Sequence, residues 1–168
     1  MTSDSIRAFI DRHTAGWNRR DAASLSLGHA EDGVVVSPMF GRVEGRTAIG
    51  GTYVALFSIF PDWEIRFDAP IADGTRLAVS FSVAATHQGD FMGFQGTGRR
   101  CSFEGVSLFE LTSDGLIAAE RRTSSASISG LRKAGLVRPC ISRNAGAEPP
   151  QMTQLWVQPR QLRAARIG

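Results

Sequence analysis

The chain begins with apolar residues three and four positions apart, which is the spacing of one face of a helix. The face over 6–17 consists of Ile6, Phe9, Ile10, His13 and Trp17. Ser3 or Asp4 is a suitable N-cap for this helix. Asp21 can cap a second, short helix over 22–29, and Gly28 and Gly33 mark the exit toward a strand.

The valine run 34–36 predicts that strand, which the pair Ser37-Pro38 ends. The segment 40–46 is rich in turn residues and predicts a connection. Thr47 can cap a third helix, whose apolar face runs to Phe60 and which Pro61 stops. Gly50 and Gly51 weaken this helix by roughly 1 kcal/mol each relative to alanine, so we expect a neighbour to approach closely there.

From Trp63 onward the apolar period changes from 3.6 to 2, which predicts half-buried strands. Four such segments follow, over 63–69, 77–87, 101–111 and 116–123. The pairs Asp73-Gly74 and Asp114-Gly115 are typical of tight turns between antiparallel strands. Helices followed by a run of strands predict an α+β fold, in which three N-terminal helices pack on a curved antiparallel sheet that forms a cone-shaped cavity.

The connection over 86–100 is the most unusual stretch, because it joins two long strands with four glycines, two aromatic residues, a methionine and a histidine. A simple hairpin turn needs one or two residues with positive φ. We therefore expect this segment to form a shaped rim over a cavity.

Charge divides the chain into two parts. Residues 132–168 hold seven basic residues against one acidic residue, whereas the other 131 residues hold 12 basic and 15 acidic ones. We expect one domain over 1–136 and a basic, disordered tail over 137–168. Since the basic excess belongs to the tail, the domain is not predicted to bind nucleic acid.

The location and partners of the protein can be predicted from features that the sequence lacks. There is no apolar run of about 20 residues, so no membrane span or membrane partner is expected. The N-terminus has no secretory pattern. Cys101 and Cys140 are far apart and have no metal-ligand spacing, which favours reduced thiols and a cytoplasmic location.

Four residues are candidates for acid/base or oxyanion chemistry, namely His87, Glu104, Glu120 and Arg122. His87 ends a strand and could carry a proton or bind a ligand carbonyl, or simply anchor the loop. Glu104 and Glu120 would have raised pKa values if buried, and the alternative is exposure on the outer face. Arg122 or Arg99 could hold an anionic oxygen, or join neighbouring strands by ion pairs.

Aromatic and sulfur-containing side chains are candidates for a pocket that accepts a flat, hydrophobic molecule. These ligand-binding candidates are Tyr53, Phe57, Trp63, Phe91, Met92 and Phe94, together with Arg99. Residues at helical spacing serve the core more often than a pocket, so the loop residues among them are the stronger candidates.

Several other kinds of site are not supported. His13, His29 and His87 lack cysteine or acidic residues at metal spacing, so no metal site is predicted. The glycines of 93–98 lie between antiparallel strands and have the wrong spacing for a phosphate loop. No Gly-x-Ser-x-Gly elbow is present.

A set of short motifs spans roughly residues 5 to 122 in a fixed order. They are Trp17-Asn18 with Asp21, Ser37-Pro38 with Gly41 and Gly45-Arg46, Phe60-Pro61-Asp62-Trp63, Thr86-His87-Gln88-Gly89 with Phe91 and Gly93, Gly96-Thr97-Gly98-Arg99, and Asp114-Gly115-Leu116-Ile117. In these motifs the chain resembles the SnoaL-like polyketide cyclases of the nuclear-transport-factor-2-like superfamily.

The resemblance implies cyclisation of a small hydrophobic carbonyl compound by intramolecular aldol condensation, without a metal or an organic cofactor. It also implies a homodimer. The family's acid/base aspartate would fall at Ser125 or Ala126, so this chain has no carboxylate at that place. The alternative is therefore a catalytically silent module that binds a small ligand or serves dimerisation.

Overall fold

The computed structural model describes residues 1–91 and 95–124. It contains three helices and seven strands, in the order α1 (Ser3–Arg19), α2 (Ala22–Leu27), β1 (His29–Ser37), β2 (Gly41–Glu44), α3 (Arg46–Ile59), β3 (Glu64–Phe67), β4 (Ile71–Asp73), β5 (Arg76–Thr86), β6 (Arg100–Leu111) and β7 (Ile117–Ser124). The predicted α+β fold with three helices on a curved sheet is confirmed. The expected tail, its boundary at 136, Ser125 and Ala126 lie outside the described residues.

The sheet is mixed rather than antiparallel. Its strand order is β2-β1-β7-β6-β5-β3, with β4 paired to β5, and β1 lies parallel to β7. The prediction of an antiparallel sheet was wrong for this pair, because β1 and β7 lie at opposite ends of the described sequence and no turn joins them to set their relative direction. The short strands β2 and β4 were also missed, since each has only three or four residues.

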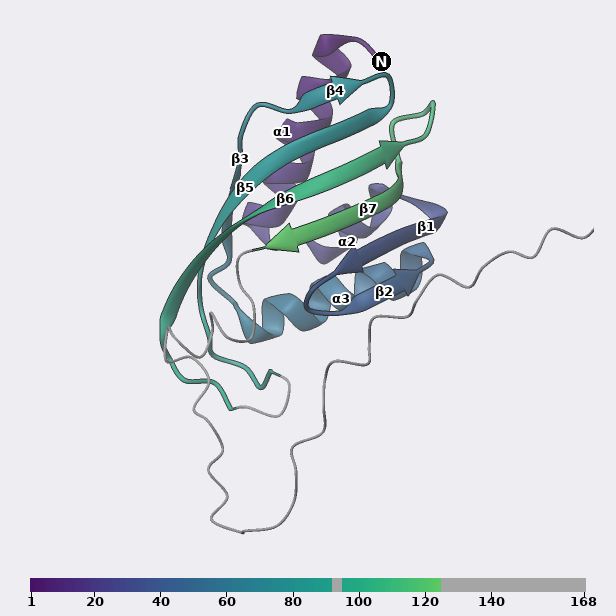
Figure 1. Ribbon diagram of the computed structural model, residues 1–168. Coiled ribbons are helices and arrows are strands. Elements are labelled where there is room, and N and C mark those ends of the chain that lie inside the picture. The colour runs from purple at the N-terminus through teal and green to yellow at the C-terminus, as the bar shows by residue number, and fades with distance from the viewer. Residues whose placement is uncertain (92–94, 125–168) are drawn as a thin grey trace, which may run out of the picture.

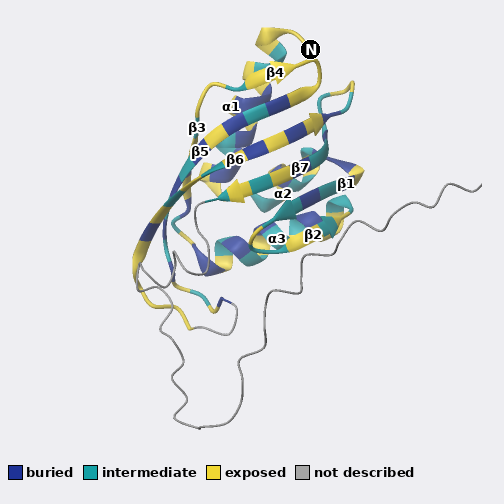
Figure 2. Ribbon diagram, in the orientation of Figure 1, coloured by how far each residue is buried: buried dark blue, intermediate teal, exposed yellow. Residues whose placement is uncertain are grey.

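All three helices cover one face of the sheet, and the long strands β5 and β6 are curved along their length (Figure 1). Buried and exposed residues alternate along both strands, as the period of 2 predicted (Figure 2). Gly105 lies opposite Phe81 at this bend, where a Cβ would come within 2.4 Å of the Phe81 ring and 2.1 Å of the Thr123 carbonyl oxygen. Glycine therefore allows three strands to converge there.

The helix starts agree only partly with the expected caps. The Asp21 carboxylate accepts from the backbone N–H of Ser24 and caps α2, as predicted. The cap of α1 is Thr2 rather than Ser3 or Asp4, and the cap of α3 is Gly45, two positions before the predicted Thr47. Differences of one or two residues do not change which face of each helix is buried.

The glycine-rich connection is tied at its base. The backbone N–H of His87 donates to Arg99 at 3.0 Å, and that of Gly98 donates to His87 at 2.8 Å. The Asp62 carboxylate accepts from the backbone N–H and the hydroxyl of Thr86, both at 2.6 Å. These bonds join the loop to the start of β3. Met92 and Phe94 lie outside the described residues.

Candidate functional site

A pocket opens between the helices and the concave face of the sheet. Its volume is about 80 Å³. Its lining is mostly aromatic and aliphatic and consists of Trp17, Ser37, Pro38, Met39, Phe40, Leu56, Phe60, Trp63, Ile65, Phe67, Phe81, Phe91, Cys101, Phe103, Ser107, Arg122 and Ser124. Arg122 is the charged residue among them, so it sets the chemistry of the pocket.

Arg122 forms an ion pair with Glu120 beneath the pocket. Nε of Arg122 donates to Oε1 of Glu120 at 2.6 Å, and Nη2 donates to Oε2 at 2.7 Å. The Glu120 side chain is fully buried, and that of Arg122 is 15% exposed. The hydroxyl of Ser107 donates to Oε1 of Glu120 at 3.2 Å. Both carboxylate oxygens are therefore occupied, and Glu120 is a counter-ion rather than a free base.

A β-bulge in β7 turns this pair inward. Leu111 pairs with Ile117, but Glu110 pairs with Ala119, so β7 carries one extra residue. In a regular strand, Ile117 and Glu120 would face opposite sides of the sheet. Because the bulge shifts the alternation by one residue, both are buried. The same shift places Arg122 in the pocket wall.

Tyr53 and His29 extend the polar cluster away from the pocket. Nη2 of Arg122 donates to the phenolic oxygen of Tyr53 at 2.8 Å, and that oxygen lies 2.9 Å from Nε2 of His29. Tyr53 and His29 are 1% and 0% exposed. The cluster thus connects α3, the start of β1 and β7 through side chains.

Trp17 covers the guanidinium from the side of α1. The guanidinium carbon of Arg122 lies 5.0 Å from the Trp17 ring centroid, within the range of a cation–π contact. Nε1 of Trp17 donates to Nε2 of His13 at 2.9 Å, and Trp63 stacks on its ring. Arg122 is therefore held by a carboxylate, a phenol and an indole face.

Burial and the ion pair determine the charge states of the cluster. Burial lowers the pKa of His13 and of His29 from 6.5 to about 4, so both are neutral at pH 7. Burial raises the pKa of Glu120, but the attraction and hydrogen bonds of Arg122 outweigh this, so the net pKa lies below its usual value. Burial also raises the pKa of Tyr53. The cluster contains one fixed cation and one fixed anion.

His87 lies beside the pocket but does not line it. Its ring is 3% exposed and packs 5.7 Å from the Phe60 ring and 6.5 Å from the Phe91 ring, both of which belong to the wall. Nδ1 lies 3.3 Å from the Thr97 hydroxyl. Nε2 is buried and has no hydrogen-bond partner within the described residues. One aromatic ring thus separates His87 from the pocket.

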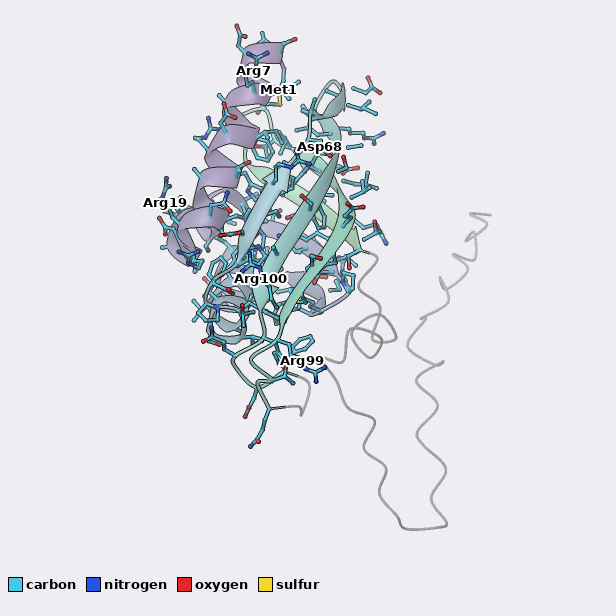
Figure 3. The ribbon with its side chains drawn as sticks, turned by 90° about the vertical axis from the view of Figure 1, so that its left-hand side faces the viewer. Met1, Arg7, Arg19, Asp68, Arg99 and Arg100 are labelled. Atoms are coloured by element: carbon cyan, nitrogen blue, oxygen red, sulfur yellow. The ribbon has the colours of Figure 1, made fainter. Side chains whose placement is uncertain are left out.

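The other predicted residues divide between the pocket, the core and the surface. Trp63 and Phe91 line the pocket. Tyr53 is a core residue, and Phe57 is partly buried against Trp17. Glu104 and Arg99 are exposed, Glu104 on the outer face of β6 and Arg99 at the end of the loop (Figure 3). Neither is among the described residues that line this first pocket.

Within residues 1–91 and 95–124, no group of three or more histidine, cysteine or acidic side chains is arranged to hold a metal ion. Across the same residues, no helix is both long and apolar enough to cross a membrane.

Comparisons with known proteins agree with this architecture. The family model for SnoaL-like polyketide cyclases matches residues 7–124. The chain belongs to the SnoaL-like polyketide cyclase family. No curated protein shows significant sequence similarity to it.

Solved structures place this SnoaL-like chain among proteins of the ketosteroid isomerase-like fold. AclR from Streptomyces galilaeus, a candidate hydroxylase, is 26% identical, with 82% of this chain and 89% of AclR covered and a TM-score of 0.68. IdmH from Streptomyces antibioticus, a candidate polyketide cyclase, is 21% identical over 77% of this chain and 97% of IdmH, with a TM-score of 0.64. A protein of ketosteroid isomerase-like fold from Catenulispora acidiphila, solved with trimethylamine, is 17% identical over 77% and 93% of the two chains, with a TM-score of 0.65.

Four residues of this SnoaL-like site were not predicted from the sequence to belong to it. His29 was assigned to the end of the second helix, but it begins β1. Ser107 was visible as the one hydroxyl among the inward-facing residues of β6. His13 and Trp17 were assigned to a helix face, and nothing in that spacing indicates that they hydrogen-bond to each other.

Proposed function

We propose that this SnoaL-like protein binds a small, mostly apolar molecule through a carbonyl or enolate oxygen that accepts from Arg122. The observation that carries the proposal is one arginine, held in place by Glu120 and Tyr53, in the wall of an otherwise apolar pocket. In ligand pockets with a mostly apolar lining, a small number of polar groups fix the orientation of the ligand.

The setting of Arg122 favours a polar or negatively charged oxygen over other groups. A guanidinium carries five donor hydrogens, and three of its hydrogen bonds here go to Glu120 and Tyr53. The remaining donors can face a ligand. Because these partners hold the guanidinium before binding, it need not reorganise when charge develops on a ligand oxygen.

The charge preference can be tested with para-nitrophenol, whose ionised form is coloured and resembles an enolate. We expect the ionised form to bind preferentially, so the pKa of the bound phenol should fall. Trp17 and Trp63 line the pocket and provide a fluorescence signal for binding. Absorbance titrations across pH, with and without protein, measure both quantities.

The variants for this test must leave no charge buried alone. The double variant Glu120→Gln/Arg122→Met removes both partners, and we expect it to bind the ionised phenol about tenfold more weakly. Arg100→Met is the matched control, because Arg100 is exposed and pairs with Asp62 and Glu64 at the start of β6 (Figure 3). Equal affinity in the double variant, or no preference for the ionised form, contradicts the proposal.

Cyclisation is a second candidate function, favoured by the family and by Nε2 of His87, which has no hydrogen-bond partner among the described residues. In this step the ring of Phe60 or Phe91 turns aside so that His87 reaches the ligand and removes a proton from carbon next to a carbonyl, and Arg122 stabilises the enolate oxygen. The enolate carbon bonds to a second carbonyl carbon of the same molecule, and the resulting alkoxide takes back the proton. Atoms and electrons balance without an oxidant or a cofactor.

A linear diketone able to close a six-membered ring serves as a test substrate. We expect wild-type protein to accelerate formation of the cyclic product, detected by chromatography, and His87→Ala to abolish this acceleration while the fold is retained. Circular dichroism checks the fold. If His87→Ala cyclises the diketone as fast as wild type, His87 is not the base. If wild type binds para-nitrophenol but yields no cyclic product from a series of diketones, the silent binding module is favoured.

We further propose a cytoplasmic homodimer that forms through the outer face of the sheet. Val106 and Leu108 of β6 are 39% and 46% exposed on that face. Light scattering coupled to size exclusion tests this proposal. A monomer at micromolar concentration, or a dimer unaffected by Leu108→Glu, contradicts it.

A further inference from the structure

A second pocket, of about 260 Å³, lies on the side of α1 and α2 and is separate from the first. Its lining comes from α1, α2 and the turn between β6 and β7 and consists of Phe9, Arg12, His13, Ser24, Leu25, Leu27, Gly28, Asp114, Gly115 and Leu116. It shares no described residue with the first pocket. It therefore offers a second place for a small molecule.

His13 presents a hydrogen-bond donor that no other described residue uses. Its Nε2 lies 2.9 Å from Nε1 of Trp17, and an indole N–H only donates, so Nε2 must accept. The imidazole is neutral at pH 7, so its single proton is on Nδ1. Nδ1 has no acceptor among the described residues, and it is not one of the fully buried atoms without a partner, so it is open to the pocket that His13 lines. An acceptor on a ligand in this pocket can therefore receive its hydrogen bond.

Arg12 adds a positive charge next to this donor. Its side chain is exposed and forms no ion pair within the part of the chain that the structure describes. Phe9, Leu25 and Leu27 supply apolar surface around it, and Leu27 is 64% exposed. Asp114 stands at the same rim and opposes an anion. An apolar body with one acidic group would match both kinds of surface.

We propose that the second pocket binds a small carboxylic acid with an aromatic or aliphatic body, whose carboxylate accepts from Arg12 and from Nδ1 of His13. The body packs against Phe9 and the leucines of α2. A guanidinium and an N–H donor converging on one carboxylate form charge-assisted hydrogen bonds, the stronger kind in proteins. The proposal for this second pocket does not rest on the oxygen-binding role proposed for Arg122.

Occupation of this site is transmitted to the first pocket through one hydrogen bond. His13 belongs to the wall of the second pocket, and Trp17 belongs to the wall of the first. A carboxylate on Nδ1 strengthens Nε2 as an acceptor, because hydrogen bonds in a chain polarise one another. The indole N–H resonance of Trp17 should therefore report binding in the second pocket.

Benzoate is the probe, and benzamide is its uncharged counterpart. Nitrogen–proton correlation spectra of the full chain should show saturable movement of the Trp17 indole resonance with benzoate and at least about fivefold weaker binding of benzamide. Trp17→Phe assigns the resonance. Movement that does not saturate, or equal binding of the two probes, overturns the proposal.

Three variants locate the site. Arg12→Met should weaken benzoate binding at least about fivefold, and Asp114→Asn should strengthen it by removing a like charge. Arg7→Met is the control, because Arg7 is exposed near the start of the same helix and outside the pocket (Figure 3). If Arg7→Met and Arg12→Met have equal effects, benzoate responds only to general charge and the site is rejected.

Discussion

Nη2 of Arg122 donates to the phenolic oxygen of Tyr53 at 2.8 Å, across 69 positions of sequence. This bond joins α3 to β7 and holds the guanidinium at the pocket wall. Tyr53 is itself fully buried, and its oxygen also lies next to His29. One phenol thus serves two partners, namely Arg122, which Glu120 also holds, and His29, whose Nδ1 has no partner among the described residues.

Tyr53→Phe should destabilise the protein although it keeps the aromatic ring. The variant leaves one Arg122 hydrogen and the Nε2 of His29 without their partner, so we expect the free energy of unfolding to fall by about 1–3 kcal/mol. Urea denaturation measures the loss. Phe57→Leu, which changes packing against Trp17 without touching the polar cluster, is the comparison. An unchanged midpoint for Tyr53→Phe would show that the phenol does not support the cluster.

Glu120 and Arg122 should behave as one unit in a double-mutant cycle. Arg122→Met alone leaves the carboxylate buried without a cation, and we expect a loss of about 3–5 kcal/mol in the free energy of unfolding. Adding Glu120→Gln should restore part of this loss, because no uncompensated charge remains. Losses that simply add would mean that the two side chains are not coupled.

Stability should fall on acidification before the carboxylates titrate. His13 and His29 have pKa values lowered by burial from 6.5 to about 4. Between these values the unfolded chain binds protons that the folded chain does not, so the free energy of unfolding decreases as pH falls. Each histidine contributes a slope of up to about 1.4 kcal/mol per pH unit.

Urea unfolding at a series of pH values measures this slope, and His29→Gln should reduce it by removing one group. Glu120 affects the stability of the protein at a lower pH than the histidines do. Its pKa is held below the usual 4.5, so its stabilising contribution is lost only as pH falls below that value. A flat free energy of unfolding between about pH 6.5 and pH 4.5 would mean that the histidines are not held neutral.

Alanine substitutions at Gly50 and at Gly51 of α3 should have different effects on the stability of the protein. A Cβ on Gly50 would lie 2.8 Å from Oγ of Ser26, whose hydroxyl donates to the Arg46 carbonyl, whereas a Cβ on Gly51 meets no atom of the described residues within 4 Å. We expect Gly51→Ala to raise the free energy of unfolding by about 0.5–1 kcal/mol. Gly50→Ala should be neutral or destabilising. Thermal unfolding distinguishes them, and equal gains would exclude a close approach at Gly50.

Local pattern determined much of this protein from sequence alone. The change of apolar period from 3.6 to 2 located the helices and the long strands, and Asp21 and the Asp-Gly pairs located a helix start and two turns. The expected close approach at Gly50 was also correct, although Gly51 has none. Such features depend on residues a few positions apart, so they can be predicted without knowing the fold.

Only the tertiary structure decided what the pocket contains. Glu120 and Arg122 face inward because β7 carries one extra residue. Such a bulge cannot be predicted from the alternation of apolar and polar residues along a strand. Tyr53 meets Arg122, and His13 meets the second pocket, only after α1 and α3 pack on the sheet. Contacts between distant segments depend on sheet order and register, which short-range patterns do not specify.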